Sequence, residues 1–242
     1  MTTIELPDIE MPGGLCHFVA TPIGNMQDVT LRALGVLAAA EVIYAEDTRH
    51  TSGLLKRYGL RAPLVSYHDH NKQQVVPRIV ADLQVQKRVA IVSDAGMPCV
   101  NDPGYSLVLA LLREGLPWTI IPGPSSVLAG LVLAGFSPDR FLFAGYPPRK
   151  KGQRSRFLEE MLAAGCTVVL LESCHRITST LEMLAELDPQ RQVAVVREIT
   201  KIYEETLRGT ASEVAPRMTG KRLRGELVLV LDGPGKKESR GE

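Results

Sequence analysis

Strand-sized apolar runs alternate with helical patterns along the first half of this chain. The runs are residues 15–20, 42–45, 89–92 and 119–121, and the helical patterns between them are residues 31–40, 73–83 and 107–113. Short apolar runs of this kind are typical of strands buried inside a parallel sheet. The alternation therefore predicts an α/β domain built on a mostly parallel sheet.

The second half repeats the alternation with closer spacing of its last strands. The expected strands are residues 141–144, 167–171, 192–196, 205–208 and 226–231, and the expected helices are residues 155–163, 177–186 and 211–217. Close spacing favours antiparallel neighbours, so this half is predicted to form a mixed sheet.

A helix-breaking segment, GFSPD at residues 135–139, separates the two series. It ends a helix that begins near Ser125, and no apolar periodicity crosses it. We therefore expect two α/β domains, residues 15–137 and residues 138–233. The ends of the chain, residues 1–14 and 234–242, are predicted to be flexible tails.

Three glycine-containing turns follow strands of the first domain. They are TPIGN at residues 21–25, SDAGMPCVNDPG at residues 93–104 and PGPSS at residues 122–126. In a parallel sheet these turns lie at one edge, where ligands of open α/β sheets bind. Neither GxGxxG nor GxxxxGK[ST] occurs, so the usual dinucleotide fingerprint and the phosphate-binding P-loop are both missing.

Polar side chains also follow two other strands. EDTRHT contains Glu46, Asp47 and Arg49 directly after the second strand, and a helix start capped by Asp47 or Thr48 would explain part of this cluster. YHDHNK contains two histidines at residues 68 and 70, but no third or fourth ligand stands at a suitable spacing, so we expect no metal.

A basic run, RKKGQRSR at residues 149–156, opens the second domain. It holds five basic residues and no acidic one, while the formal net charge of the whole chain is only +1. Any binding to a polyanion must therefore come from local clustering. The run indicates either a phosphate-rich substrate or a solvated basic helix start.

The location of the protein is expected to be cytoplasmic. The N-terminus is acidic and interrupted by proline, unlike a signal peptide, and the four cysteines form no CxxC pair. The longest apolar runs are strand-sized, so no membrane association is expected.

Six segments together resemble one known family. They are ATPIGN, EDTRHT, SDAGMPCVNDPG, IPGPSS, GYPPRKKGQR and LLESCHR, in the order of the family and spread over residues 16–233. The family is that of the bacterial small-subunit rRNA ribose 2′-O-methyltransferases, which belong to the tetrapyrrole methylase superfamily, or class III methyltransferases.

The resemblance implies a homodimeric, two-lobed enzyme that binds S-adenosyl-L-methionine between its lobes. It also implies that the methyl group is transferred to the ribose of a decoding-centre cytidine in 16S rRNA of the small ribosomal subunit. The cofactor-binding positions that follow from it are Pro22, Ala95, Gly96, Met97, Val100, Ser125, Ser126, Glu172 and Ile199. Met97 replaces an acidic residue of the tetrapyrrole enzymes, which argues against their substrates.

Methyl transfer to a ribose hydroxyl depends on alignment and is assisted by a base. Glu46, Asp47 and Lys150 are the candidates for this proton transfer. Arg49 is expected to hold a phosphate or a carboxylate. Backbone phosphate contacts are predicted for Arg149, Lys151, Arg154 and Arg156.

Other functions remain open at this point. The acceptor of the methyl group could be a tetrapyrrole or a protein side chain, although the basic run speaks against a small macrocycle. A non-catalytic RNA-binding assembly factor would show salt-sensitive RNA binding without affinity for the cofactor. A nucleotide-sugar or NAD enzyme on a similar sheet is disfavoured by the missing fingerprint.

Overall fold

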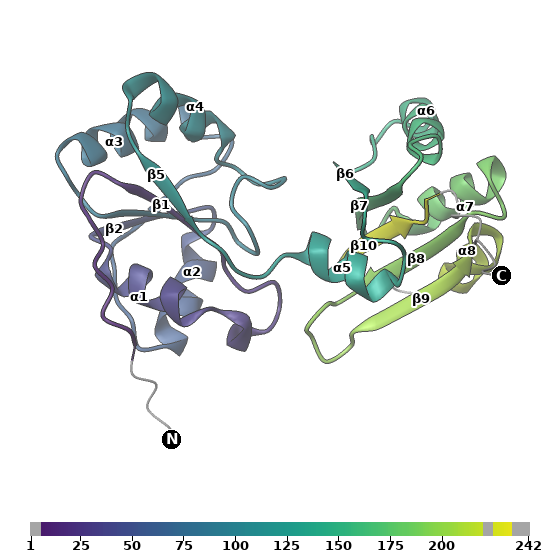
Figure 1. Cartoon of the computed structure of the whole chain (residues 1–242), viewed down its shortest axis with the longest axis horizontal. Helices are drawn as coiled ribbons and strands as arrows, with labels where there is room; N and C mark the ends of the chain where they lie inside the picture. Colours follow the sequence, from purple (N-terminus) through teal and green to yellow (C-terminus); the bar gives the residue numbers. More distant parts are fainter. Residues whose placement is uncertain (1–5, 220–224, 234–242) are drawn as a thin grey trace, which may run out of the picture. The chain divides into compact units, whose positions relative to one another are not determined.

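The computed structural model describes residues 6–219 and 225–233. By its internal contacts the chain divides into two compact units, Met1–Ser125 and Ser126–Glu242. Figure 1 labels the helices and strands of both units.

The first unit contains a five-stranded sheet in which every neighbouring pair is parallel. Its strands are β1 (Cys16–Val19), β2 (Val42–Ala45), β3 (Leu64–Ser66), β4 (Val89–Val92) and β5 (Trp118–Ile121). Their order across the sheet is β3-β2-β4-β1-β5. The parallel sheet predicted for the first half of the chain is confirmed.

Helices cover both faces of this sheet, as Figure 1 shows. The helical segments are η1 (Met26–Asp28), α1 (Leu31–Ala39), α2 (Thr48–Arg57), α3 (Lys72–Gln84) and α4 (Tyr105–Glu114). Because successive strand residues alternate between faces, Ile43 packs with α1 and α2, whereas Tyr44 packs with α3 and α4. The strands are thus buried on both faces, which explains their continuous apolar runs.

The second unit contains a mixed sheet. Its elements are α5 (Ser126–Ala134), β6 (Phe141–Gly145), α6 (Lys151–Leu162), β7 (Thr167–Ser173), α7 (Ile177–Leu187), β8 (Gln192–Arg197), β9 (Glu205–Thr210), α8 (Ala211–Met218) and β10 (Glu226–Leu231). The order is β6-β7-β10-β8-β9, and β6 with β7 is the parallel pair while the other pairs are antiparallel. The mixed sheet predicted for the second half is also confirmed.

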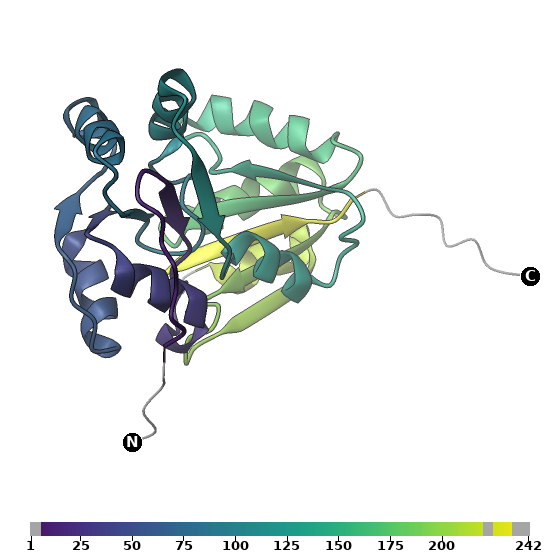
Figure 2. The ribbon, with the colours of Figure 1, turned by 60° about the vertical axis from the view of Figure 1, so that its left-hand side comes forward.

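Helix α5 belongs to the second unit, so the boundary lies after Ser125 instead of after residue 137. The physical reason is the packing of α5 on the sheet. A Cβ atom on Gly130 would lie 2.5 Å from Cγ1 of Val228, which means that the helix backbone rests directly on β10. Arg208 of β9 donates to the carbonyl oxygen of Ala134 at the end of the helix, over 3.0 Å. In Figure 2 the strands of this unit lie between α5 (teal) and α6 (green).

The N-terminal segment packs on the first unit where the structure describes it. Met11 is buried in the core that α1 and α2 share, and Ile9 packs against the same core. Gly35 of α1 makes room for Ile9, since a Cβ atom there would lie 2.4 Å from Cγ1 of that residue. The expectation of a flexible tail over residues 1–14 is corrected for this part, because two apolar side chains anchor it. The expected tail over residues 234–242 lies outside the described residues.

Candidate functional site

The loops at the carboxyl ends of the five parallel strands share one edge of the first sheet. We call four of them the strand-end loops. They are residues 20–25 after β1, residues 46–47 after β2, residues 93–104 after β4 and residues 122–125 after β5. The three glycine turns singled out in the sequence are therefore on the same edge, as the parallel arrangement requires.

The loops after β1 and β4 are joined by backbone hydrogen bonds. The N–H of Thr21 donates to the carbonyl oxygen of Gly96, and the N–H of Gly96 donates to that of Thr21, each over 3.0 Å. The hydroxyl of Thr21 also donates to the carbonyl oxygen of Ser93 over 3.2 Å. These hydrogen bonds thus tie together two loops that are far apart in the sequence.

Gly96 is the point at which three strand-end loops meet. Its φ of +80° is in the left-handed region that favours glycine. A Cβ atom at this position would lie 3.3 Å from Cγ2 of Ile23 and 3.6 Å from the carbonyl oxygen of Pro124. The loops after β1, β4 and β5 therefore approach one another closely at this glycine.

The predicted cofactor positions around Gly96 differ in exposure. Pro22 is buried, Ala95 and Met97 are half-buried, and Val100 is exposed. Ser125 and Ser126 are half-buried, Ser125 as the last residue of the first unit and Ser126 as the first residue of α5. All six side chains are uncharged.

The end of the β4 loop has an unusual backbone. Cys99 and Asn101 adopt left-handed conformations, with φ of 70° and 65°. Such conformations are costly for residues with a side chain and cluster at functional sites. The left-handed backbone of these two residues is compatible with a ligand site in residues 93–104, although Gln86, Glu198 and Thr200 adopt the same conformation elsewhere.

Ser93 is a candidate that the sequence analysis missed. It lies directly after β4, is buried, and its hydroxyl has no hydrogen-bond partner among the described residues. A buried polar group without a partner is uncommon in a finished fold. Its position as the first residue after a buried strand is the feature of the sequence that could have identified it.

Carboxylates connect the loops after β2 and β4. The side chain of Asp94 accepts a hydrogen bond from the N–H of Asp47 over 2.9 Å, and that of Glu46 accepts from the N–H of Asp94 over 3.4 Å. Burial, and then the nearby charge of Asp94, raise the pKa of Glu46 above its ordinary value. Asp94 was missed as a site residue, although it stands beside Ser93 in the same motif.

Asp47 has the opposite environment. Its carboxylate caps α2 by accepting from the N–H of Arg49 over 2.8 Å, and it pairs with the guanidinium of Arg49 over 2.6 Å. These hydrogen bonds hold the pKa of Asp47 well below its usual range. A carboxylate with a low pKa is a weak base. Of the two carboxylates considered for proton transfer, Glu46 is therefore the better suited, and the helix-cap interpretation of Asp47 is confirmed.

His68 lies at the same edge, after β3. Its Nδ1 atom is buried and has no partner among the described residues, and its ring stands 5.9 Å from that of His70 in an edge-on arrangement. Within the part of the chain that the structure describes, no three residues of the His, Cys, Asp and Glu types gather in a metal-binding arrangement.

The basic run lies in the second unit, around the start of α6. Arg149 and Lys150 precede the helix, with Lys150 as its N-cap, and Lys151 is its first residue. Lys151 and Arg156 are exposed, as expected of phosphate contacts, whereas Arg154 is buried. Arg154 is buried because its side chain lies on the face of α6 that carries the buried Leu158, and its role as a phosphate contact stays a prediction.

Glu172 is held inside the second unit. Its buried carboxylate pairs with Arg176 over 2.6 Å and accepts from the hydroxyl of Thr180 over 2.7 Å. Ile199 is buried in the loop after β8, between Glu198 and Thr200. The roles assigned to Glu172 and Ile199 in binding the adenine stay predictions, and the carboxylate already has internal partners.

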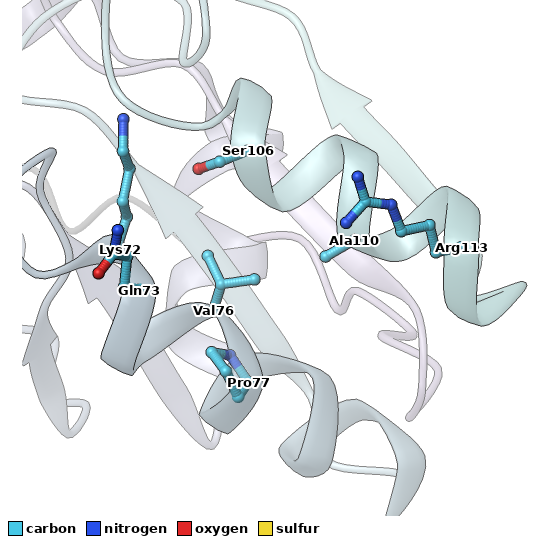
Figure 3. A pocket seen from close by; sticks show the side chains of 7 residues that line it. All are labelled: Lys72, Gln73, Val76, Pro77, Ser106, Ala110 and Arg113. Atoms are coloured by element: carbon cyan, nitrogen blue, oxygen red, sulfur yellow. The ribbon is translucent and has the colours of Figure 1, made fainter.

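A surface groove between α3 and α4 is a separate feature of the first unit. It is lined by Lys72, Gln73, Val76, Pro77, Ser106, Ala110 and Arg113. Figure 3 shows Lys72 and Ser106 at the end where both helices begin, with Arg113 extending back toward Ala110. Its volume of about 250 Å³ is below the roughly 300–1,000 Å³ of pockets that enclose drug-sized ligands. We therefore keep the strand-end loops as the candidate site.

Among the described residues, no helix combines the length and the apolar character that crossing a membrane requires.

Comparison with known proteins identifies relatives over nearly the whole chain. The family model of the tetrapyrrole (corrin/porphyrin) methylases matches residues 16–215. Ribosomal RNA small subunit methyltransferase I of Thermotoga maritima is 41% identical over 220 residues, which cover 91% of this chain and 99% of the relative. The protein of the same name from Halalkalibacterium halodurans is 42% identical over 224 residues, covering 93% of this chain and 78% of the relative.

Solved structures with a similar fold include a uroporphyrin-III-C-methyltransferase from Thermus thermophilus. The TM-score is 0.64 at 24% identity, covering 90% of this chain and 94% of that chain. A diphthine synthase has a TM-score of 0.68 at 18% identity, covering 90% of both chains. At these identities the likeness concerns the fold alone.

Proposed function

Because the chain belongs to the tetrapyrrole methylase family, and within it to the ribosomal RNA small subunit methyltransferase I group, we propose that it is an S-adenosyl-L-methionine-dependent rRNA methyltransferase. Its acceptor is rRNA of the small ribosomal subunit. More specifically, we propose that the methyl group is transferred to the ribose 2′-oxygen of a decoding-centre cytidine in 16S rRNA.

The meeting of three strand-end loops at Gly96 is the observation that supports a cofactor site best. A ligand at the carboxyl edge of a parallel sheet is held largely by backbone groups, and glycine permits that approach. The Thr21 to Gly96 pairing fixes the loops after β1 and β4 relative to each other. A preformed site of this kind lowers the ordering cost of binding.

The residues of this edge fit the cofactor chemically. Pro22, Ala95 and Met97 offer apolar contact, and the unpartnered hydroxyl of Ser93 offers a hydrogen bond that the fold leaves unused. Ser125 follows on the neighbouring loop. When bound, S-adenosyl-L-methionine supplies an electrophilic methyl group attached to a positively charged sulfur.

Glu46 is the group of the first unit best suited to accept the proton of a ribose hydroxyl. Its raised pKa makes it a stronger base than an ordinary carboxylate, and its hydrogen bond from the N–H of Asp94 orients it. Asp47 instead holds α2 and Arg49 in place. Lys150, at the start of α6, remains the candidate from the second unit.

RNA binding is assigned to the basic residues at the start of α6. Arg149, Lys150 and Lys151 are exposed and lie within one turn of each other, where they can contact consecutive phosphates. Such contacts fix position without reading sequence, so recognition of one nucleotide depends on the folded shape of the rRNA. We also propose that the protein acts in the cytoplasm and that it is a homodimer. Light scattering on the purified protein tests the dimer.

The decisive experiment has two steps. Calorimetric titration with S-adenosyl-L-methionine, and separately with S-adenosylhomocysteine, measures cofactor affinity. Incubation of unmodified small subunits with the protein and isotope-labelled cofactor, followed by mass spectrometry of nuclease fragments, then locates the methyl group. Saturable binding with a labelled cytidine ribose supports the whole proposal. A label on another atom of the rRNA would overturn only the assignment of the cytidine ribose. A folded protein that binds no cofactor, alone or with small subunits, would overturn the assignment as a methyltransferase.

A further inference from the structure

The first turn of α6 leaves backbone donors unused. Lys150 is the N-cap residue, and its side chain makes no capping hydrogen bond. The first helical bond runs from the N–H of Arg154 to the carbonyl oxygen of Lys150, over 2.9 Å. The N–H groups of the preceding helical residues therefore point out of the helix without helical acceptors, at the positive end of its dipole.

Arg154 is a buried cation without a counter-ion among the described residues. Only 8% of the residue is exposed, and its Nε atom is fully buried without a hydrogen-bond partner. No hydrogen bond or ion pair of its side chain to another residue occurs within the described ranges. A buried charge is costly unless a partner of opposite charge compensates it.

Other shielded arginines of the same unit are compensated. Arg176 pairs with Glu172 over 2.6 Å and donates to the carbonyl oxygen of Pro147 over 2.9 Å. Arg191 pairs with Asp188 over 3.0 Å and donates to two backbone carbonyl oxygens besides. The missing anion is therefore a property of the Arg154 site and not of the unit as a whole.

The general geometry of an α-helix relates these two features. Side chains of an α-helix tilt toward its N-terminus, so a residue in the second turn extends over the first turn. That end also carries Arg149, Lys150 and Lys151, and residues 149–156 contain no acidic side chain. Uncapped amides and exposed cations thus lie at the end of α6 toward which the Arg154 side chain is expected to extend.

We propose that the first turn of α6 and Arg154 form a binding site for a single phosphate group, occupied in function by one backbone phosphodiester of the RNA substrate. The inference rests on the proposed function for the identity of that RNA. It goes further by separating one fixed phosphate, held by backbone amides and a buried guanidinium, from the looser contacts of the exposed basic residues.

Thermal unfolding in the presence of inorganic phosphate tests the site without RNA or cofactor. Phosphate, compared with chloride at equal ionic strength, is expected to raise the Tm of the full chain by a few degrees in a saturable manner. Arg154→Gln should lose this rise, and in phosphate-free buffer it should unfold at or above the Tm of the wild-type chain, because an uncompensated buried charge is removed. The matched control is Arg140→Gln, which removes an exposed arginine charge of the same unit outside residues 149–156 and should keep the full rise.

Two further variants keep the test decisive. Arg154→Met retains an apolar stem and replaces Arg154→Gln if the latter does not fold. Arg154→Lys keeps the charge without the planar fork and should show a reduced rise. A phosphate response in the Arg154→Met or Arg154→Gln chain equal to that of wild type overturns the proposal.

Binding to purified small subunits tests the identity of the phosphate. Arg154→Gln should lower the affinity about tenfold and reduce the salt slope by about one, whereas the control Arg140→Gln should change the affinity about twofold or less. Loss of the phosphate response without any change in subunit binding would overturn the RNA assignment. Titration with S-adenosyl-L-methionine is expected to be unaffected by Arg154→Gln. If no variant and no wild-type chain binds that cofactor, the proposed function fails while the phosphate site still stands on its own result.

Discussion

Thr21 and Gly96 exchange two backbone hydrogen bonds, each 3.0 Å long, although they follow different strands of the sheet. The pairing extends the order of the sheet beyond the ends of β1 and β4. It also helps to hold the left-handed backbone of Gly96 in place, because it ties the loop after β4 to the loop after β1.

Replacing Gly96 with alanine should weaken cofactor binding. The left-handed φ of +80° costs a residue with a Cβ atom about 1–2 kcal/mol, and the new atom would lie 3.3 Å from Cγ2 of Ile23. We expect the affinity for S-adenosyl-L-methionine, measured by calorimetry, to fall about tenfold or more. The matched control is Gly59→Ala, because Gly59 has a φ of +69° and a Cβ atom added there would meet no other atom within 4 Å. Equal affinities of both variants would remove Gly96 from the cofactor site.

Glu46→Gln should change the pH dependence of stability. The pKa of Glu46 is raised in the folded protein by burial and by Asp94, so the folded state keeps this proton to higher pH than the unfolded state does. The free energy of unfolding of the wild-type chain therefore falls as pH rises from the ordinary carboxyl range through the raised pKa. The variant should be as stable as wild type at low pH and more stable above that range, in urea unfolding at several pH values. A difference that does not vary with pH would contradict the assignment.

The same variant separates proton transfer from binding. If Glu46 accepts the ribose proton, turnover of the Glu46→Gln chain should fall about a hundredfold or more, while cofactor affinity remains near the wild-type value. Asp47→Asn serves for comparison, because the geometry gives Asp47 a capping role in α2. A turnover loss confined to Asp47→Asn would reverse the two roles.

Breaking the buried ion pair of the second unit should be strongly destabilising. The side chain of Glu172 is fully shielded, with 0% exposed, and Arg176 is its charged partner. Arg176→Met should lower the free energy of unfolding by about 3 kcal/mol or more, because an uncompensated carboxylate remains. The double variant Glu172→Met with Arg176→Met should recover a large part of this loss. Urea unfolding of the wild type, of Arg176→Met and Glu172→Met singly and of the double variant measures the coupling, and additive effects would argue against a direct pair.

Two glycine substitutions should have opposite effects on stability. Gly130→Ala places a methyl 2.5 Å from Val228, a β-branched core residue that cannot yield easily, so we expect a loss of about 1–3 kcal/mol. Gly53→Ala, in the exposed middle of α2, meets no atom within 4 Å and should gain about 0.5–1 kcal/mol. Thermal unfolding compares them, and a stabilised Gly130→Ala chain would mean that α5 does not rest on β10.

The apolar periodicity of the sequence was sufficient to predict the two sheets and most of their helices. The strands at residues 42–45, 89–92 and 226–231 begin and end as predicted, because each is a run that is buried apart from Glu226 and is bounded by polar or turn residues. Local patterns do not, however, reveal which sheet a helix packs on. The contact of Gly130 with Val228 joins residues far apart in the chain, and for that reason the boundary was misplaced.

The same limit applies to the candidate site. The glycine turns could be placed on one edge of the sheet from the parallel strands alone. The low pKa of Asp47 and the uncompensated charge of Arg154, however, depend on which side chains lie beside them, and a sequence does not show this. Asp47 has a partner two residues away in Arg49, whereas Arg154 has none among the described residues. The anchoring of residues 9–11 was missed because two apolar residues within a proline-containing segment are too few to form a pattern.

The order β3-β2-β4-β1-β5 places the first strand of the chain between two strands that are made much later. In the finished sheet Cys16 lies opposite Val89 of β4 on one side and Trp118 of β5 on the other. During synthesis, β1 has no neighbour until β4 has emerged, and one of its edges stays open until β5 follows. By contrast, β8 and β9 are consecutive and pair as soon as both exist. We therefore expect the parallel sheet to be the slow step of folding, and chains that stop before residue 118 to aggregate through the open edge of β1.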